Sequence, residues 1–472
     1  MREYCGIAGV ASKKGKSVAD ILYLALFSLQ HRGQESAGIV TYGKDGHKAH
    51  KGFGQVKEVF TIDVLNKLEG YVGIGHTRYS TVGSSNNFNN IQPLYVVSRE
   101  RFIAVAHNGT LTNYKELRNE LESQGYVFHS TTDSELFLYL FSMSDGMTVE
   151  ERFLNILKKV KGAYSLLFLI DDAIYFLRDP WGFRPLVYGE NENYFMVASE
   201  TPALKHAGIC NFKELKPGEL GIFKDGRLEL KQLYPSNKRE QCVFELIYFS
   251  RPDSRTFGKN VYKFRRECGR ELALLETEEI EIVVPVPDSG LPASVGYASQ
   301  IGKPLEFGLM RSHYTGRSFI EPYDRDKKVR MKLIPIEEVL KGKRVALIDD
   351  SLVRGTTSKE IVKLLREHGA REVHLRFASP PIVAPCFFGI DIPTRDELLA
   401  SSHTLEELTE ILGADSVMYL PMSKLKKVLG DDWKDFCFSC FTGNYNEDTV
   451  SEAVRREFLN YKPPILMQFE SY

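Results

Sequence analysis

A stretch that reads VALIDDSLVRGTT constrains the fold of this 472-residue chain more than any other. Its apolar residues predict a strand over Arg344–Ile348, which ends in two neighbouring acids, Asp349 and Asp350. After a short loop, apolar residues at helical spacing predict a helix over Thr357–His368, with a glycine directly behind it. A strand that passes through a short loop into a helix begins a βα unit, which predicts a parallel α/β sheet.

The loop in this stretch has the composition of a phosphate site. Backbone N–H groups at a helix N-terminus attract anions. Gly355 lets the backbone approach a ligand closely, and Ser351, Thr356 and Thr357 add hydroxyl donors. The acids end the strand at the edge where open α/β sheets bind ligands, and there they can take ribose hydroxyls or Mg²⁺. A second acid pair, at 171–172, runs straight into another apolar run and predicts only a hairpin turn.

Further strands at Glu281–Val286 and Val373–Ala378 extend the predicted parallel sheet. The first of these strands is followed by Asp288 and Ser289, and then by a helix of small residues. The connection between them is either a second phosphate-binding loop or a simple βα turn. The basic segment Arg311–Lys332 lacks a helical period and predicts a mobile loop over a site, or a linker.

Residues 5–235 have a different pattern, in which short runs of strand-forming residues alternate with turns that contain Gly or Asn. Helices are expected at Ala19–Leu29, Tyr114–Ser123 and Ser134–Phe141, and strands at Tyr71–His76, Phe102–His107, Ser165–Ile170 and Ile174–Arg178. The polar stretch Leu233–Glu240 predicts a connector between two domains.

Composition excludes several classes of protein. The 61 basic and 62 acidic side chains balance, which gives no sign of a nucleic-acid or membrane-surface partner. The apolar runs are strand-sized, far below the ~18 residues of a membrane span. Seven cysteines, an odd number in a large chain, favour a reducing compartment, and we expect a cytoplasmic protein.

Cys5 lies four residues behind Met1, in CGIAGV. If the leader MREY is removed, the thiol gains its own α-amino group as a base, which titrates near pKa ~7.7–8.0. The alternative is a small buried hydrophobe on a first strand.

Acyl transfer at Cys5 needs an oxyanion site and a means of holding the substrate. Asn108 could offer a side-chain amide and Gly109 a backbone N–H, although Asn-Gly is also an ordinary turn. Arg78 and Asp133 could pair with the carboxylate and ammonium of an amino acid.

Five segments occur in the order and spacing of class II glutamine amidotransferases: CGIAGV, LQHRGQESAGI, GHTRYSTVGSS, HNGTLTNYKELR and TTDSE. The ALIDDSLVRGTT stretch resembles the motif with which type I phosphoribosyltransferases bind phosphoribosyl diphosphate (PRPP). With SRPDS between the two sets, the chain resembles the amidophosphoribosyltransferase family from Cys5 to at least Cys440.

The resemblance implies an N-terminal nucleophile domain with four αββα layers, joined to a phosphoribosyltransferase domain with a parallel sheet. It implies a propeptide at 1–4, an amidotransferase domain at 5–235, a phosphoribosyltransferase domain at 236–445 and a helical tail at 446–472. Cleavage before Cys5 frees the nucleophile, although this leader is shorter than is usual in the processed branch of the family.

The resemblance also implies the remaining roles. Cys5 releases ammonia from glutamine, Asn108 and Gly109 bind the oxyanion, and the ammonia passes inside the protein to PRPP. Arg78 and Asp133 hold glutamine, and the loop at 311–332 closes over PRPP with its basic residues Arg311, Arg317, Lys327, Lys328, Arg330 and Lys332. PRPP would be bound by Asp288, Ser289, Asp349, Asp350, Ser351, Gly355, Thr356 and Thr357, and Mg²⁺ by Ser289, Asp349 and Asp350. Purine nucleotides are expected as feedback inhibitors, and a homotetramer or homodimer as the assembly.

Cys437 and Cys440 form a CxxC pair, which by itself suits zinc, an iron–sulfur cluster, redox chemistry or no function. Zinc is the expectation from spacing alone. One branch of the family carries a [4Fe-4S] cluster on cysteines in these segments, which implies Cys242, Cys386, Cys437 and Cys440 as ligands. Cys210 and Cys268 are read as plain thiols.

Two alternatives stay open from the sequence. One is a glutamine amidotransferase with another acceptor, and the other is an iron–sulfur regulatory protein without activity.

Overall fold

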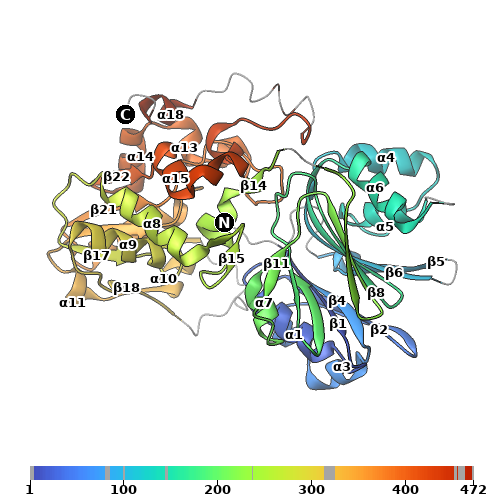
Figure 1. Ribbon diagram of the computed structural model, residues 1–472. Helices are drawn as coiled ribbons and strands as arrows, with labels where there is room; N and C mark the ends of the chain where they lie inside the picture. The colour runs from blue at the N-terminus through green and yellow to red at the C-terminus, as the bar shows by residue number, and fades with distance from the viewer. Residues whose placement is uncertain are drawn as a thin grey trace.

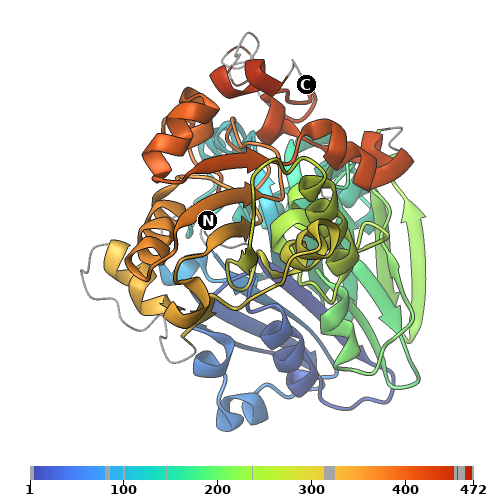
Figure 2. The ribbon, with the colours of Figure 1, turned by 90° about the vertical axis from the view of Figure 1, so that its left-hand side faces the viewer.

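The computed structural model describes residues 5–79, 86–98, 101–143, 147–235, 238–312, 325–450, 454, 456 and 463–469. Its elements form two halves that lie side by side, blue to green and yellow to red (Figure 1). Figure 2 shows the second half in front of the first.

The first half is built on two antiparallel sheets. Strand order in the seven-stranded sheet is β11 (Phe212–Glu214), β9 (Val187–Glu190), β10 (Tyr194–Ala198), β1 (Gly6–Ser12), β4 (Val72–Arg78), β2 (Ser36–Gly43) and β3 (Gly46–Phe53). The six-stranded sheet has the order β13 (Arg227–Gln232), β12 (Glu219–Lys224), β8 (Ala173–Arg178), β7 (Gly162–Ile170), β6 (Arg101–Leu111) and β5 (Leu94–Ser98).

The sheets pack face to face because alternate residues of their strands are apolar and buried between them, among them Ile7, Val40, Ile74, Phe102, Leu167 and Phe176. Helices cover both outer faces: α1 (Ala19–Ser28), α2 (Val56–Val59), α3 (Ile62–Lys67) and α7 (Thr201–Lys205) on one side, and α4 (Tyr114–Ser123), α5 (Glu135–Ser142) and α6 (Val149–Lys159) on the other. The four-layer αββα prediction is confirmed, and so is the hairpin turn at Asp171 and Asp172 between β7 and β8.

The second half contains a four-stranded parallel sheet. Its strand order is β17 (Ile282–Pro285), β20 (Arg344–Asp349), β21 (Glu372–Phe377) and β22 (Ser416–Tyr419). One face packs against α8 (Val261–Ala273), α9 (Leu291–Ile301) and α15 (Met422–Leu429), and the other against α11 (Glu337–Leu340), α12 (Thr356–Glu367), α13 (Leu399–Ser402) and α14 (Leu405–Leu412). The predicted parallel sheet and the predicted helix behind Asp350 are confirmed.

Short elements complete the second half. Its paired strands are β14 (Gln241–Cys242) with β23 (Phe436–Cys437), β15 (Arg255–Thr256) with β16 (Lys259–Asn260), and β18 (Leu309–Arg311) with β19 (Leu333–Pro335). Its 3₁₀ or π turns are η2 (Glu245–Phe249), η3 (Arg395–Glu397) and η4 (Gly430–Asp435), and its remaining helices are α16 (Ser439–Thr442) and α18 (Pro464–Phe469). The first half has one such turn among the described residues, η1 (Phe88–Asn90). None of the helices in the described part of the chain is long and apolar enough to span a membrane.

The prediction that the segment 311–332 is irregular is wrong for its last part. Residues Arg325–Lys332 form helix α10, which packs on α12. Arg330 donates to both carboxylate oxygens of Glu367 on α12, at 2.7 and 3.0 Å. Basic side chains have good helix propensity, and this tertiary contact supplies the stabilisation that an apolar face would otherwise give. Residues 313–324, with Arg317, lie outside the described residues.

Candidate active sites

Cys5 directly precedes β1, whose Gly6 pairs with Thr77 near the end of β4. The thiol is buried, and its Sγ donates to the backbone oxygen of Tyr79 at 3.5 Å. Burial raises the pKa of the Cys5 thiol to about 11, against the opposing charge of Arg78. A thiol in this setting is neutral near pH 7, so its reactivity depends on a base that reaches it directly.

Arg78 and Asp133 lie close enough for their charges to act on the Cys5 thiol. Arg78 ends β4, is buried, and its Nη1 lies 3.9 Å from the carboxylate of Glu35. Asp133 precedes α5, and its Oδ2 accepts a hydrogen bond from Leu111 N, at the end of β6, at 2.9 Å. A buried guanidinium and a buried carboxylate therefore both act on the Cys5 thiol.

Asn108 and Gly109 are part of β6, so the alternative of an Asn-Gly turn is wrong. Asn108 is fully buried, and neither its Nδ2 nor its Oδ1 has a hydrogen-bond partner among the described residues. Gly109 has φ +150°, and a Cβ there would lie 1.9 Å from the oxygen of Ala163 in β7. Close pairing of β6 with β7 therefore requires glycine at this position and leaves an amide without a partner beside it.

The second site lies at the end of β20. Ser289 Oγ donates to Asp349 Oδ1 at 3.1 Å, and Asp350 N donates to the same oxygen at 2.9 Å. Burial, with the neighbouring carboxylate, raises the pKa of Asp349 well above its usual range, and burial raises the pKa of Asp350. Two adjacent carboxylates with raised pKa values favour a cation or hydroxyl donors between them.

Helix α12 begins beside these acids. Gly355 is its N-cap with φ +75°, no side chain caps the first turn, and Thr356 and Thr357 are exposed there. A Cβ on Gly355 would lie 2.5 Å from Leu399 Cδ2, and the positive φ strains any other residue, so this position favours glycine. Uncapped N–H groups with exposed hydroxyls suit an anion.

The other predicted ligands of this site differ in their surroundings. Ser351 is buried and its hydroxyl donates to Asp350. Asp288 is exposed and accepts from Arg311 Nη1 at 2.7 Å. A cavity of about 10 Å³, enough for one water-sized molecule, lies beside Asp350 and Ser289 and is otherwise lined by Ile247, Phe264, Arg265, Cys268, Ala293 and Ala378.

The four cysteines of the predicted cluster come together. Cys242 lies opposite Cys437 in the parallel pair of β14 and β23, and the backbone N–H groups of Val383 and Ala384, just before Cys386, donate to the oxygen of Cys440. Burial, and then the three other cysteines, raises the pKa of the Cys440 thiol well above its usual range.

The described residues contain no group of three or more His, Cys, Asp or Glu side chains placed to hold one metal ion. In a [4Fe-4S] cluster each iron takes one cysteine, so the four thiolates stand further apart than the ligands of a single ion. The four thiols come from three segments and are free of disulfides; Cys440 is buried and the other three are partly buried.

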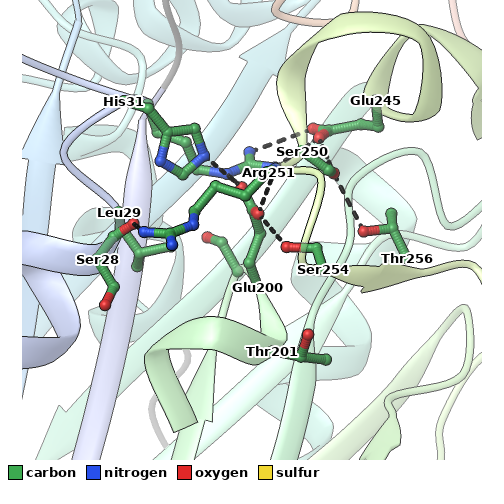
Figure 3. A network of polar contacts seen from close by, with 12 residues as sticks. Ser28, Leu29, His31, Glu200, Thr201, Glu245, Ser250, Arg251, Ser254 and Thr256 are labelled. Atoms are coloured by element: carbon green, nitrogen blue, oxygen red, sulfur yellow. Dashed lines mark hydrogen bonds and ion pairs between the residues drawn. The ribbon is translucent and has the colours of Figure 1, made fainter. Parts of the chain in front are cut away.

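A buried network of charged side chains, which the sequence did not predict, joins the two halves (Figure 3). Arg32, behind α1, lies between the carboxylates of Glu200 and Glu245 and donates to both. Arg184 Nη1 lies 3.1 Å from Glu245 Oε1. Against the effect of burial, the charge of Arg32 holds the pKa of Glu200 well below its usual range and lowers the pKa of Glu245.

The SRPDS segment completes this contact. Arg251 N donates to Glu200 Oε2 at 2.9 Å, and the hydroxyl of Ser254 donates to the same oxygen (Figure 3). Arg265 Nη2 donates to Ser250 O at 2.7 Å, and its charge acts on the Asp350 carboxylate. Hydrogen bonds and charge thus connect Arg32, behind α1, with Asp350 of the second candidate site. The only sequence signal for this network was a charged residue inside an apolar run, such as Glu245 in FELIYF.

Comparison with known proteins adds an independent result. Residues 76–206 match the model of the glutamine amidotransferase domain, and residues 266–377 match that of the phosphoribosyl transferase domain. The chain is 46% identical to amidophosphoribosyltransferase 1, chloroplastic, of Arabidopsis thaliana over 96% of this chain and 81% of the relative. It is 43% identical to an amidophosphoribosyltransferase of Archaeoglobus fulgidus, over 93% of this chain and 97% of the relative.

A solved structure is similar throughout. The glutamine PRPP amidotransferase of B. subtilis, complexed with ADP and GMP, aligns with a TM-score of 0.88 at 42% identity. The alignment covers 94% of this chain and 99% of that one.

Proposed function

Because this chain belongs to the amidophosphoribosyltransferase family, we propose that its two candidate sites carry out the two parts of that reaction, with Cys5 as the nucleophile. The enzyme hydrolyses glutamine and transfers the ammonia internally to PRPP, which gives 5-phosphoribosylamine, glutamate and pyrophosphate. This is the first committed step of purine synthesis. Since the second half matches a phosphoribosyltransferase, the alternative of another acceptor is wrong.

Glutamine hydrolysis starts once the residues before Cys5 are removed. The new α-amino group takes the thiol proton, and Sγ attacks the side-chain amide carbon of glutamine. Asn108 Nδ2 and Gly109 N donate to the oxyanion of the tetrahedral intermediate. The ammonium then returns its proton to the leaving nitrogen, ammonia departs, and water hydrolyses the thioester to glutamate.

Arg78 and Asp133 hold the substrate during these steps. The Arg78 guanidinium pairs with the α-carboxylate of glutamine, and the Asp133 carboxylate pairs with its ammonium. The burial of both, together with their effect on the Cys5 thiol, supports these roles. Glu35 lies 3.9 Å from the Arg78 guanidinium and orients it.

PRPP is bound in the second half. Its 5-phosphate accepts from the N–H groups and hydroxyls of Thr356 and Thr357, and the acids Asp349 and Asp350 take the ribose hydroxyls. Ser351 and Gly355 shape the loop between them, while Asp288 and Ser289 border the pyrophosphate. Mg²⁺, when bound, neutralises pyrophosphate charge, and oxygen donors at Ser289, Asp349 and Asp350 fit it.

Two features support passage of ammonia between the sites. The buried network around Glu245 excludes water from the junction of the halves, since the charges of Arg32, Glu200 and Glu245 have protein partners. The cavity of about 10 Å³ beside Asp350 is the size of one ammonia molecule. The loop that includes Arg311 and α10 would close over PRPP and keep water from its reactive carbon.

A [4Fe-4S] cluster is proposed on Cys242, Cys386, Cys437 and Cys440, where it would cross-link the segment around Cys440 to the junction of the halves. Its role there would be structural, because it would hold these segments together. Seven free cysteines support a reducing, cytoplasmic location.

We further propose feedback inhibition by purine nucleotides, which the ADP and GMP bound to the B. subtilis relative support. The division into residues 1–4, 5–235, 236–445 and 446–472, and a dimer or tetramer, remain proposals.

One observation carries the assignment of the first site: a fully buried Asn108 amide without a partner among the described residues, in the half of the chain that also buries the Cys5 thiol, Arg78 and Asp133. A crossed pair of variants tests both sites. Cys5→Ser should abolish synthesis with glutamine and retain synthesis with ammonium chloride. Asp349→Asn should reduce both syntheses and retain basal glutamate release.

Cys210→Ser, at the exposed cysteine, is the matched control and should behave as wild type. Glutamine-dependent synthesis by Cys5→Ser at the wild-type rate would contradict the assignment of the nucleophile.

A further inference from the structure

The second half of the chain contacts the strand that carries the oxyanion donors. Gly389 follows β21 in the loop that also contains Cys386, and its φ is +91°. A Cβ on Gly389 would lie 3.1 Å from the carbonyl carbon of Gly109 and 3.2 Å from Thr110 Oγ1. The backbone of this loop therefore lies against the peptide group that joins Gly109 to Thr110, next to the Cα of Gly109.

The loop around Gly389 is held firmly in place. Arg184 donates to the oxygen of Phe388 from Nε at 3.2 Å and from Nη2 at 2.7 Å. The ring of Phe388 stacks on that of Phe183, with centroids 4.3 Å apart and an interplanar angle of 20°. Phe388 N donates to Cys386 Sγ at 3.4 Å. Arg184 and Phe388 are buried, so these bonds do not compete with bulk water.

Gly109 is therefore enclosed by two parts of the chain. Ala163 of β7 lies against it within the first half, and Gly389 lies against it from the second half. The same guanidinium that fixes the Phe388 carbonyl, that of Arg184, pairs with Glu245 at 3.1 Å in the network between the halves. Neither glycine accepts a side chain without displacing a neighbouring segment.

We propose that Gly389 is a positioning residue for glutamine hydrolysis: from the phosphoribosyltransferase half it holds the Gly109–Thr110 peptide in place and thereby fixes the backbone of Gly109, with its N–H, in the orientation that binds the oxyanion. The proposal rests on the oxyanion role given above to Asn108 and Gly109. It makes the glutaminase site incomplete without the second half of the chain. It also gives the second half a direct means of changing kcat for glutamine, because a shift of this loop moves an oxyanion donor.

The test is Gly389→Ala in the full-length processed enzyme, with glutamine-dependent and ammonia-dependent synthesis measured on the same preparation. A new Cβ would lie 3.1 Å from Arg184 Nη2 and from the carbonyl carbon of Gly109. It would displace the backbone at Gly109 by a fraction of an ångström, and misplacement of this order reduces turnover roughly 10- to 100-fold. The reduction is expected in kcat with glutamine, with KM for glutamine and the ammonia-dependent rate unchanged.

Gly413→Ala is the matched control, because Gly413 also has positive φ, +68°, but a Cβ added there would meet no atom of the described chain within 4 Å. It should leave both activities at wild-type values. Phe388→Leu, which removes the ring stacking without backbone strain, should lower kcat with glutamine in the same direction as Gly389→Ala by a smaller factor. Asn108→Ala should lower it more than either.

The variants distinguish failure of the oxyanion site from failure of the positioning role alone. Wild-type kcat in Asn108→Ala would overturn the oxyanion site and the positioning role with it. Reduced kcat in Asn108→Ala but not in Gly389→Ala or Phe388→Leu would overturn the positioning role alone. Equal loss of both activities in Gly389→Ala, or a loss of kcat that follows loss of iron from the protein, would also overturn it.

Discussion

Replacement of Asn108 by leucine should make the protein more stable and its glutaminase much slower. Each buried polar atom without a partner costs about 1–3 kcal/mol, and Asn108 has two such atoms among the described residues. Leucine removes both, and its side chain has the same number of heavy atoms with the same branch point, although its methyl groups take more space than the planar amide. Allowing for imperfect packing, we expect the free energy of unfolding to rise by ~1–3 kcal/mol, which is roughly 2–4 °C in Tm per kcal/mol for a unit of this size.

The same substitution removes an oxyanion donor, so kcat with glutamine should fall by about 10²–10³-fold. Ammonia-dependent synthesis, which needs only the second site, should persist and shows that the variant is folded. Differential scanning calorimetry and a glutamate-release assay measure the two effects on one preparation.

Asn90→Leu is the matched control. Asn90 is as deeply buried, but its Nδ2 donates to Thr131 Oγ1 and its Oδ1 accepts from Thr131 N, both at 2.8 Å. Its replacement should lower Tm, because the Thr131 N–H loses its acceptor. If Asn108→Leu also lowers Tm, or if it retains wild-type kcat, the reasoning about Asn108 is refuted.

Three other substitutions give distinct outcomes. Glu245→Gln should lower the free energy of unfolding by about 3–5 kcal/mol in thermal melts, since it removes the carboxylate that the buried guanidinium groups of Arg32 and Arg184 share. Because the folded-state pKa values of Glu200 and Glu245 are depressed, the stability that these carboxylates contribute is fully present above the ordinary carboxyl pKa of ~4.3 and is lost as pH falls through the folded-state values. In this acidic range the Tm of Glu245→Gln should therefore fall less steeply with decreasing pH than the Tm of the wild type. Parallel curves of Tm against pH would contradict this. Cys437→Ala should lower iron content and Tm, whereas Cys268→Ala, at a buried cysteine outside the cluster, should leave iron content unchanged in elemental analysis. In Gly290→Ala the new Cβ lies 2.2 Å from the Ile348 carbonyl oxygen at the end of β20, so ammonia-dependent synthesis should fall with basal glutamate release intact.

Local patterns predicted the strand, loop and helix of the second candidate site well. The strand, the acids Asp349 and Asp350 and the helix behind them are specified by neighbouring residues, and the structure has all of them in order. Helix α10 was missed because it has no apolar stripe, and its contact with Glu367 on α12 is remote in sequence.

The first site depended more on tertiary structure. Asn108 and Gly109 suit a turn locally, but pairing of β6 with β7 keeps them in a strand. The contacts of Glu35, Glu245 and Gly389 link segments that are distant in the chain, so no periodicity or spacing signals them. Charged residues that are buried only against partners from other segments look like surface residues in a sequence.

The central claim is that ammonia released at Cys5 reaches PRPP inside the protein. The most direct test supplies glutamine labelled with ¹⁵N in its side-chain amide together with excess unlabelled ammonium chloride, PRPP and Mg²⁺. Glutamate, pyrophosphate and the isotope in 5-phosphoribosylamine are then followed by mass spectrometry. The account predicts as much labelled product as glutamate, with unlabelled product no greater than the same ammonium chloride gives in the absence of glutamine. Product whose label is diluted to the ratio in solution would contradict it, because the ammonia would then have mixed with the solvent.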